Sequence, residues 1–190
     1  MGFIPTYDEA LEILKKYNKD PFHITHGKTV GEVMGYFARE YDRDNVEFWR
    51  VVGLLHDLDF EMYPDEHCVK QVELMKDEGI DDSIINSTIS HGYSHTGSTV
   101  APTHIMEKIL YTVDELTGII WAASLMRPSK SVQDMNLKSV KKKFKDKKFA
   151  AGCNRDIIKE GANILGWDMD KLFTDTLDAM KETEENFSQE

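Results

Sequence analysis

Histidine and aspartate residues that could bind a divalent metal are spread along this sequence, most of them on separate predicted helices. They are His26, the adjacent pair His56 and Asp57, His67, His91 and Asp114. Imidazole nitrogens and carboxylate oxygens are common ligands of divalent metals, and a helical bundle can project them inward from several helices at once. Any one of these histidines could instead be a core residue held by hydrogen bonds.

The two aspartates make a metal site the stronger interpretation. Asp57 and Asp114 both lie within apolar stretches, where a buried carboxylate without a cationic partner costs several kcal/mol or more. Few Lys or Arg residues are close in sequence, so a metal is the cation that best fits both aspartates. The sequence therefore predicts a metal centre.

Hydrophobic spacing predicts helices for the segments that carry these residues. A helix over 7–18 follows the capping-box pair Thr6 and Glu9. A second helix begins after Pro21 and turns His26 toward the core. A third, capped by Asp44 or Asn45, ends near the His56-Asp57 pair.

The remaining segments are also predicted to be helical. A fourth helix opens at 64 or 65 and carries His67, a fifth runs from its cap at Asp82 to His91, and a long sixth over 105–126 carries Asp114. Residues 92–102 are rich in Gly, Ser and Thr and predict a loop. Further helices start after caps at 154 and 168. Since no segment shows strand alternation, the expected fold class is all-α.

Composition limits the partners and the compartment. A chain of 190 residues fits one domain, and its net charge of -11 argues against bulk nucleic acid or an anionic membrane as a partner. Cys68 and Cys153 form no Cys-x-x-Cys pattern, so neither a disulfide framework nor a thiolate zinc site is expected. No apolar run approaches the roughly 20 residues that span a bilayer, and no secretory signal is present, which predicts a cytoplasmic protein. A homo-oligomer is left open.

The ordered set His26, His56-Asp57 and Asp114 resembles the signature of the HD-domain superfamily of metal-dependent phosphohydrolases. Residues 53–61 and 113–118 are similar to a group of small bacterial and archaeal predicted HD hydrolases, and the likeness extends to 127–130, 139–143 and 149–150. This resemblance covers nearly the whole chain. It implies a single domain over 1–190 of about eight or nine helices, with a metal-binding core over about 20–126 and a helical extension over 127–190 packed on it.

The resemblance also implies a ligand set. His26, His56, Asp57 and Asp114 would hold one metal, as the corresponding residues do in the superfamily. Members with two metals add two histidines between the HD pair and the last aspartate; His67 and His91 occupy that interval, and Asp57 would then bridge. The expected metal is Fe, Mn, Co, Ni or Zn, with Mg as an option at a second site.

The implied activity is hydrolysis of a phosphomonoester or phosphodiester, in a nucleotide or another small phosphorylated metabolite, by a metal-activated water. Candidates for the general acid are Asp59, Glu61 and His95. Candidates for substrate binding are Arg127, Lys130 and Arg155 for phosphate and Tyr93 for a base or sugar.

Two other functions fit the same residues. Some HD-fold proteins with a six-ligand set are di-iron oxygenases, which iron content and oxygen uptake would reveal. A sensory module that binds a nucleotide without turnover is the other alternative, and stabilisation by nucleotides without hydrolysis would favour it.

Overall fold

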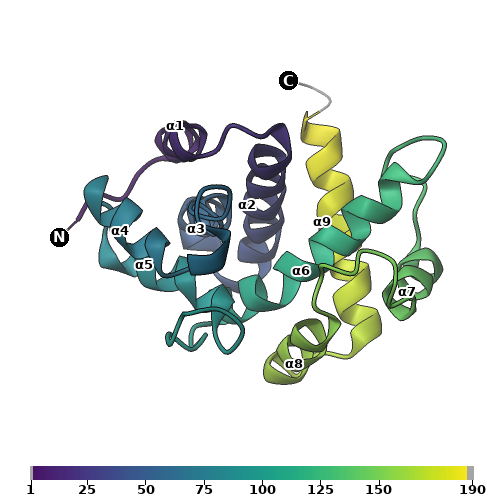
Figure 1. The fold of residues 1–190 in the computed structure, drawn as a ribbon. Coiled ribbons are helices and arrows are strands. Elements are labelled where there is room, and N and C mark those ends of the chain that lie inside the picture. Colours follow the sequence, from purple (N-terminus) through teal and green to yellow (C-terminus); the bar gives the residue numbers. More distant parts are fainter. Residues whose placement is uncertain (1, 188–190) are drawn as a thin grey trace. The chain divides into compact units, whose positions relative to one another are not determined.

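The computed structural model describes residues 2–187 and shows an all-helical chain over that range (Figure 1). Its only strand-like pairing among those residues is a single parallel bridge between Phe3 and Ile80. The predicted all-α class is confirmed. The helices form two compact units, unit 1 over Met1–Tyr111 and unit 2 over Thr112–Glu190. The sequence-based division into a core over 20–126 and an extension over 127–190 stays a prediction.

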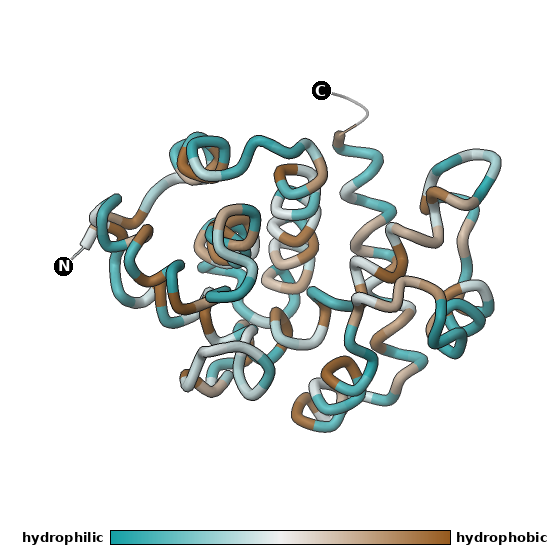
Figure 2. Tube along the Cα trace, in the orientation of Figure 1, coloured by the Kyte–Doolittle hydropathy of each residue, from teal (hydrophilic) through white to brown (hydrophobic). Residues whose placement is uncertain are grey.

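Unit 1 contains the first five α-helices and the start of the sixth. They are α1 (Tyr7–Tyr17), α2 (Pro21–Tyr41), α3 (Val46–Leu55), α4 (Lys70–Asp77), α5 (Asp82–Ile89) and α6 (Ile105–Leu125), with 3-10 helices η1 (Arg43–Asn45), η2 (Pro64–Glu66) and η3 (Ser90–Gly92) between them. The predicted capping box at Thr6 and Glu9 is present at the start of α1. Hydrophobic and hydrophilic residues alternate around α2 (Figure 2), and Val30, Val33 and Phe37 on its inward face are buried.

Glycines let α2 and α3 approach with their backbones in contact. A Cβ at Gly27 would lie 2.8 Å from the carbonyl oxygen of Leu54, and one at Gly53 would lie 2.8 Å from the carbonyl oxygen of Val30. Only glycine fits at such distances. This contact fixes the spacing between His26, next to Gly27, and the end of α3 near His56.

The segment between α3 and α5 differs from the predicted helix that opens at 64 or 65 and carries His67. It forms η2, then a turn, and only then α4, so His67 lies in the turn and not on a helix. The cause is the backbone at Cys68, whose φ of 66° lies in the left-handed region and costs about 1–2 kcal/mol for a residue with a side chain. A smaller difference is that Asp81, not Asp82, caps α5. His91 lies in η3.

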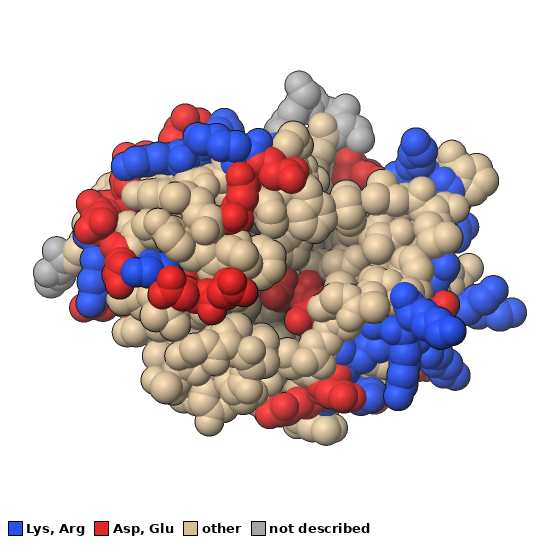
Figure 3. Space-filling model, viewed as in Figure 1, with Lys and Arg blue, Asp and Glu red and all other residues tan. Residues whose placement is uncertain are grey.

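Unit 2 contains the rest of α6 with α7 (Leu137–Lys145), α8 (Arg155–Leu165) and α9 (Met169–Phe187). Asn154 caps α8, as the sequence predicts, and Gly166 ends the helix in the left-handed conformation. Phe144 of α7 packs against Phe173 of α9 with ring centroids 4.9 Å apart. Lys and Arg side chains gather over α7 (Figure 3), where the sequence has Lys138, Lys141, Lys142, Lys143 and Lys145.

Within residues 2–187, no helix combines the length and the apolar character that crossing a bilayer requires.

Candidate metal centre

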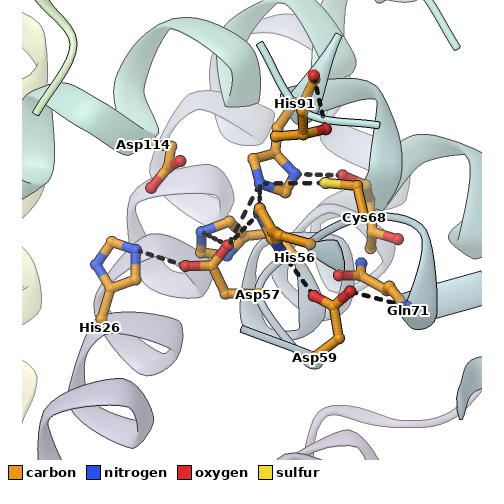
Figure 4. A network of polar contacts seen from close by, with 12 residues as sticks. His26, His56, Asp57, Asp59, Cys68, Gln71, His91 and Asp114 are labelled. Atoms are coloured by element: carbon orange, nitrogen blue, oxygen red, sulfur yellow. Dashed lines mark hydrogen bonds and ion pairs between the residues drawn. The ribbon is translucent and has the colours of Figure 1, made fainter. Parts of the chain in front are cut away.

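Four imidazole rings of unit 1 surround the carboxylate of Asp57 (Figure 4). The Nε2 atoms of His56, His67 and His91 lie 3.4, 3.3 and 3.3 Å from Oδ1 of Asp57. The Nε2 atom of His26 lies 3.6 Å from the other oxygen, Oδ2. Within unit 1, the structure thus brings together the five predicted ligands that this unit carries, and it does so around one carboxylate.

Main-chain carbonyls fix the orientation of two of the rings. Nδ1 of His56 lies 2.7 Å from the carbonyl oxygen of Gly53, and Nδ1 of His91 lies 2.5 Å from that of Thr88. A carbonyl oxygen only accepts hydrogen bonds, so in both rings Nδ1 carries the proton and donates it. With Nδ1 of each ring engaged in this way, Nε2 is the nitrogen that faces Asp57, which is the orientation that a metal ligand needs.

The carboxylate of Asp59 fixes the orientation of a third ring, that of His67. Nδ1 of His67 donates to Oδ1 of Asp59 at 2.7 Å, and the backbone N–H of Gln71 donates to Oδ2 of Asp59 at 2.8 Å. Asp59 is fully buried. Both of its oxygens are thus engaged, and the carboxylate directs Nε2 of His67 toward the cluster.

A positive charge would stabilise the close contact between His67 and His91. Their Nε2 atoms lie 3.0 Å apart, and two neutral rings that are protonated at Nδ1 would oppose two lone pairs at this contact. Burial would lower the pKa of His67, but its hydrogen bonds with Asp59 and Cys68 and the charge of Asp57 raise that pKa to about 10. Burial would also lower the pKa of His91, but the charges of Cys68 and Asp57 and hydrogen bonds with both raise that pKa well above its ordinary value. The cluster therefore has the electrostatics to hold a positive charge, as a proton or as a metal ion.

Cys68 is a potential ligand that the sequence argument did not identify. Its buried Sγ lies 3.9 Å from Nε2 of His91, and one ligand atom each from His67, Cys68 and His91 fall within 4.8 Å of one another. Burial would raise the pKa of the Cys68 thiol, but the charge of His91 and hydrogen bonds with both histidines lower it to about 6. Cys-x-x-Cys spacing could not reveal this thiol; its adjacency to His67 could have.

Asp114, the sixth predicted ligand, lies on α6 in unit 2, three residues after the last residue of unit 1. The hydroxyl of Thr117 donates to its main-chain carbonyl at 2.7 Å. Its assignment as a ligand stays an expectation from the resemblance.

The three candidate general acids have different surroundings. The carboxylate of Asp59 accepts hydrogen bonds from His67 and from the backbone of Gln71, as described above. The carboxylate of Glu61 accepts the backbone N–H groups of Lys19 and Asp20 at the start of α2. His95 is exposed, with Nδ1 2.9 Å from the carbonyl oxygen of Tyr93.

The candidate substrate-binding residues differ in the same way. In unit 2, Arg127 donates from Nε to Asp134 at 2.5 Å. Arg155 donates to main-chain carbonyls at the end of α7 and in the loop that follows it, including those of Phe144 and Phe149. These hydrogen bonds give both guanidinium groups a structural role. Lys130 and Tyr93 have exposed side chains.

Comparison with known proteins does not identify a family for this chain. No protein-family model, curated protein or solved structure matches the chain. The likeness to HD hydrolases therefore stays an expectation from the sequence.

Proposed function

We propose that this chain is a metal-dependent hydrolase that acts on phosphate esters of small metabolites, with its metal centre at Asp57. The observation that carries the proposal is the convergence of four Nε2 atoms on the Asp57 carboxylate. Three of these rings have Nδ1 engaged by an acceptor. Orientation of imidazole through its second nitrogen is the usual support of a metal ligand.

In this proposal, two groups of ligands share the carboxylate of Asp57. His26 lies on the Oδ2 side, whereas His56, His67 and His91 lie nearest Oδ1. His26, His56 and Asp57 can provide ligand atoms within 4.8 Å of one another. We assign these three residues to one ion, with Asp114 added from the resemblance. His67 and His91 would serve a second ion, bridged to the first by Asp57.

Divalent cations held by these residues would supply charge that lowers the pKa of a bound water and screens the phosphoryl oxygens. The chain itself positions the ester and manages the protons. As water oxygen bonds to phosphorus and the ester P–O bond breaks, a proton must reach the leaving oxygen. We assign that proton to His95, because its ring is exposed, whereas the carboxylate of Asp59 is fully buried and that of Glu61 accepts backbone N–H groups at the start of α2. The exposed ring of Tyr93 is our candidate for stacking on a nucleotide base.

The test is elemental analysis of protein purified without chelators, followed by a phosphoester screen with several divalent metals. We expect bound transition metal and release of phosphate from at least one ester. His56→Ala and Asp57→Ala should lose both metal and activity. The exposed residues Asp65 and His104 provide matched controls, because Asp65→Ala and His104→Ala should retain both.

Activity and metal content together separate the alternatives. Protein that binds metal but hydrolyses no ester in the screen would contradict the hydrolase assignment. Bound iron with oxygen uptake would instead support a di-iron oxygenase. Protein that binds no divalent metal would overturn the centre itself.

A further inference from the structure

The thiol of Cys68 lies inside the histidine cluster, and the hydrolytic roles proposed above do not use it. Cys68 is 1% exposed and follows His67 directly. A buried cysteine is often only a small apolar core residue. The surroundings of this one are polar: Sγ faces Nε2 of His91 at 3.9 Å and forms a compact ligand group with His67 and His91.

The distances within this group are those of ligands on a common ion. Zinc lies about 2.3 Å from a thiolate sulfur and about 2.0–2.1 Å from an imidazole nitrogen, so two such ligands on one ion lie within about 4.4 Å of each other. The separation of Sγ from Nε2 of His91 meets this limit. So does the 3.0 Å between the two Nε2 atoms.

Local backbone features bring the thiol to this position. The left-handed conformation of Cys68, with φ of 66°, is uncommon for a residue with a side chain. On the other side, Gly92 follows His91, and a Cβ at Gly92 would lie 2.5 Å from Sγ of Cys68. The chain therefore leaves space for a sulfur atom between its two histidines.

We propose that Cys68 is a thiolate ligand of the second metal ion, which makes that site His67, Cys68, His91 and the bridging Asp57. This inference rests on the proposed metal centre. On binding, the S–H bond breaks, its proton passes to solvent, and the sulfur lone pair forms the bond to the metal, with no change in oxidation state. A sulfur ligand selects softer ions, so the site should prefer Zn²⁺ or Co²⁺ to Mg²⁺.

Absorption spectroscopy of the full chain loaded with Co²⁺ tests the ligand directly. Visible d–d bands report that cobalt is bound, whereas a near-ultraviolet sulfur-to-cobalt charge-transfer band reports a thiolate ligand. We expect both in the wild-type protein. Cys68→Ser should abolish the charge-transfer band and weaken Zn²⁺ binding about 10-fold or more, since even indirect supports of a metal site cost this much.

Cys153→Ser is the matched control, because Cys153 is the other cysteine and lies in unit 2. This variant should keep the full spectrum. Visible bands without a charge-transfer band in the wild-type protein would overturn the thiolate ligand and leave the metal centre standing. So would a charge-transfer band that survives in Cys68→Ser. Absence of all cobalt bands would overturn the centre and the inference together. The wild-type spectrum alone can contradict the thiolate ligand, so the proposal stays testable even if Cys68→Ser fails to fold.

Discussion

His67 and Asp59 form a hydrogen bond of 2.7 Å between Nδ1 and Oδ1. Asp59 is fully buried, and its other oxygen accepts the backbone N–H of Gln71. The carboxylate is therefore a support of the metal centre in our proposal, although sequence alone makes it an equally good general acid. The two roles give different results on substitution.

Asp59→Asn should weaken binding of the second metal about 10–100-fold, the usual effect of removing a carboxylate that orients a histidine ligand. The amide retains the shape of the side chain, so the far-ultraviolet circular dichroism should not change. Metal titration by isothermal calorimetry measures the effect. Unchanged affinity with lost turnover would show instead that Asp59 is the acid.

His91→Ala should reduce the bound metal from two ions to one per chain, because it removes a ligand that we assign to the second site only. Its Nε2 lies next to Oδ1 of Asp57, and His26 on the Oδ2 side should keep its ion. Elemental analysis gives the ratio. Loss of both ions would mean that the five residues hold a single metal.

Gly53→Ala should destabilise the protein by about 1–3 kcal/mol, the usual cost of overpacking. A methyl group there would lie 2.8 Å from the carbonyl oxygen of Val30 and 2.9 Å from Cα of Gly31. Urea unfolding measures the loss. Gly152→Ala is the control, since a Cβ at Gly152 would meet no atom within 4 Å. Equal stabilities would contradict the backbone contact of α2 and α3.

Glu78 should contribute to stability at neutral pH but not in acid. Hydrogen bonds from Lys16 and Tyr17 lower its pKa from the ordinary 4.5, so its contribution is complete above about pH 4.5 and is lost as pH falls through the lowered pKa. The side chain of Lys16 is 60% exposed, which limits the expected effect to about 1 kcal/mol. Urea unfolding of Glu78→Gln should show this loss at neutral pH and none in acid. An equal loss at both would reject the linkage.

The helices could be predicted from sequence where local signals define them. Thr6 and Glu9 cap α1 through contacts three residues apart, and Asn154 with Gly166 delimits α8. Helical spacing also placed His26 correctly on α2. Each of these signals depends only on neighbouring residues, so no knowledge of the tertiary structure was needed.

The surroundings of the site could not be predicted from sequence, because they depend on tertiary contacts and backbone conformations that residue spacing does not reveal. The left-handed backbone at Cys68 removes His67 from the predicted helix, and the folded chain brings His91, far along the sequence, beside that thiol. Arg155 appeared suited to phosphate because of its charge, yet its guanidinium group binds main-chain carbonyls instead. Contacts of this kind, between residues far apart in the sequence or with main-chain carbonyls, form only when the chain has folded.

The contact of α2 and α3 through Gly27 and Gly53 has a consequence for attempts to re-engineer the centre. Because main-chain atoms touch there, exchanging nearby core side chains for larger or smaller ones cannot move the two helices closer or adjust their offset. The gap available to an ion between His26 and the His56-Asp57 pair is set by the polypeptide backbone. Altered ion size preference must therefore come from the more irregular segment that carries His67 and Cys68.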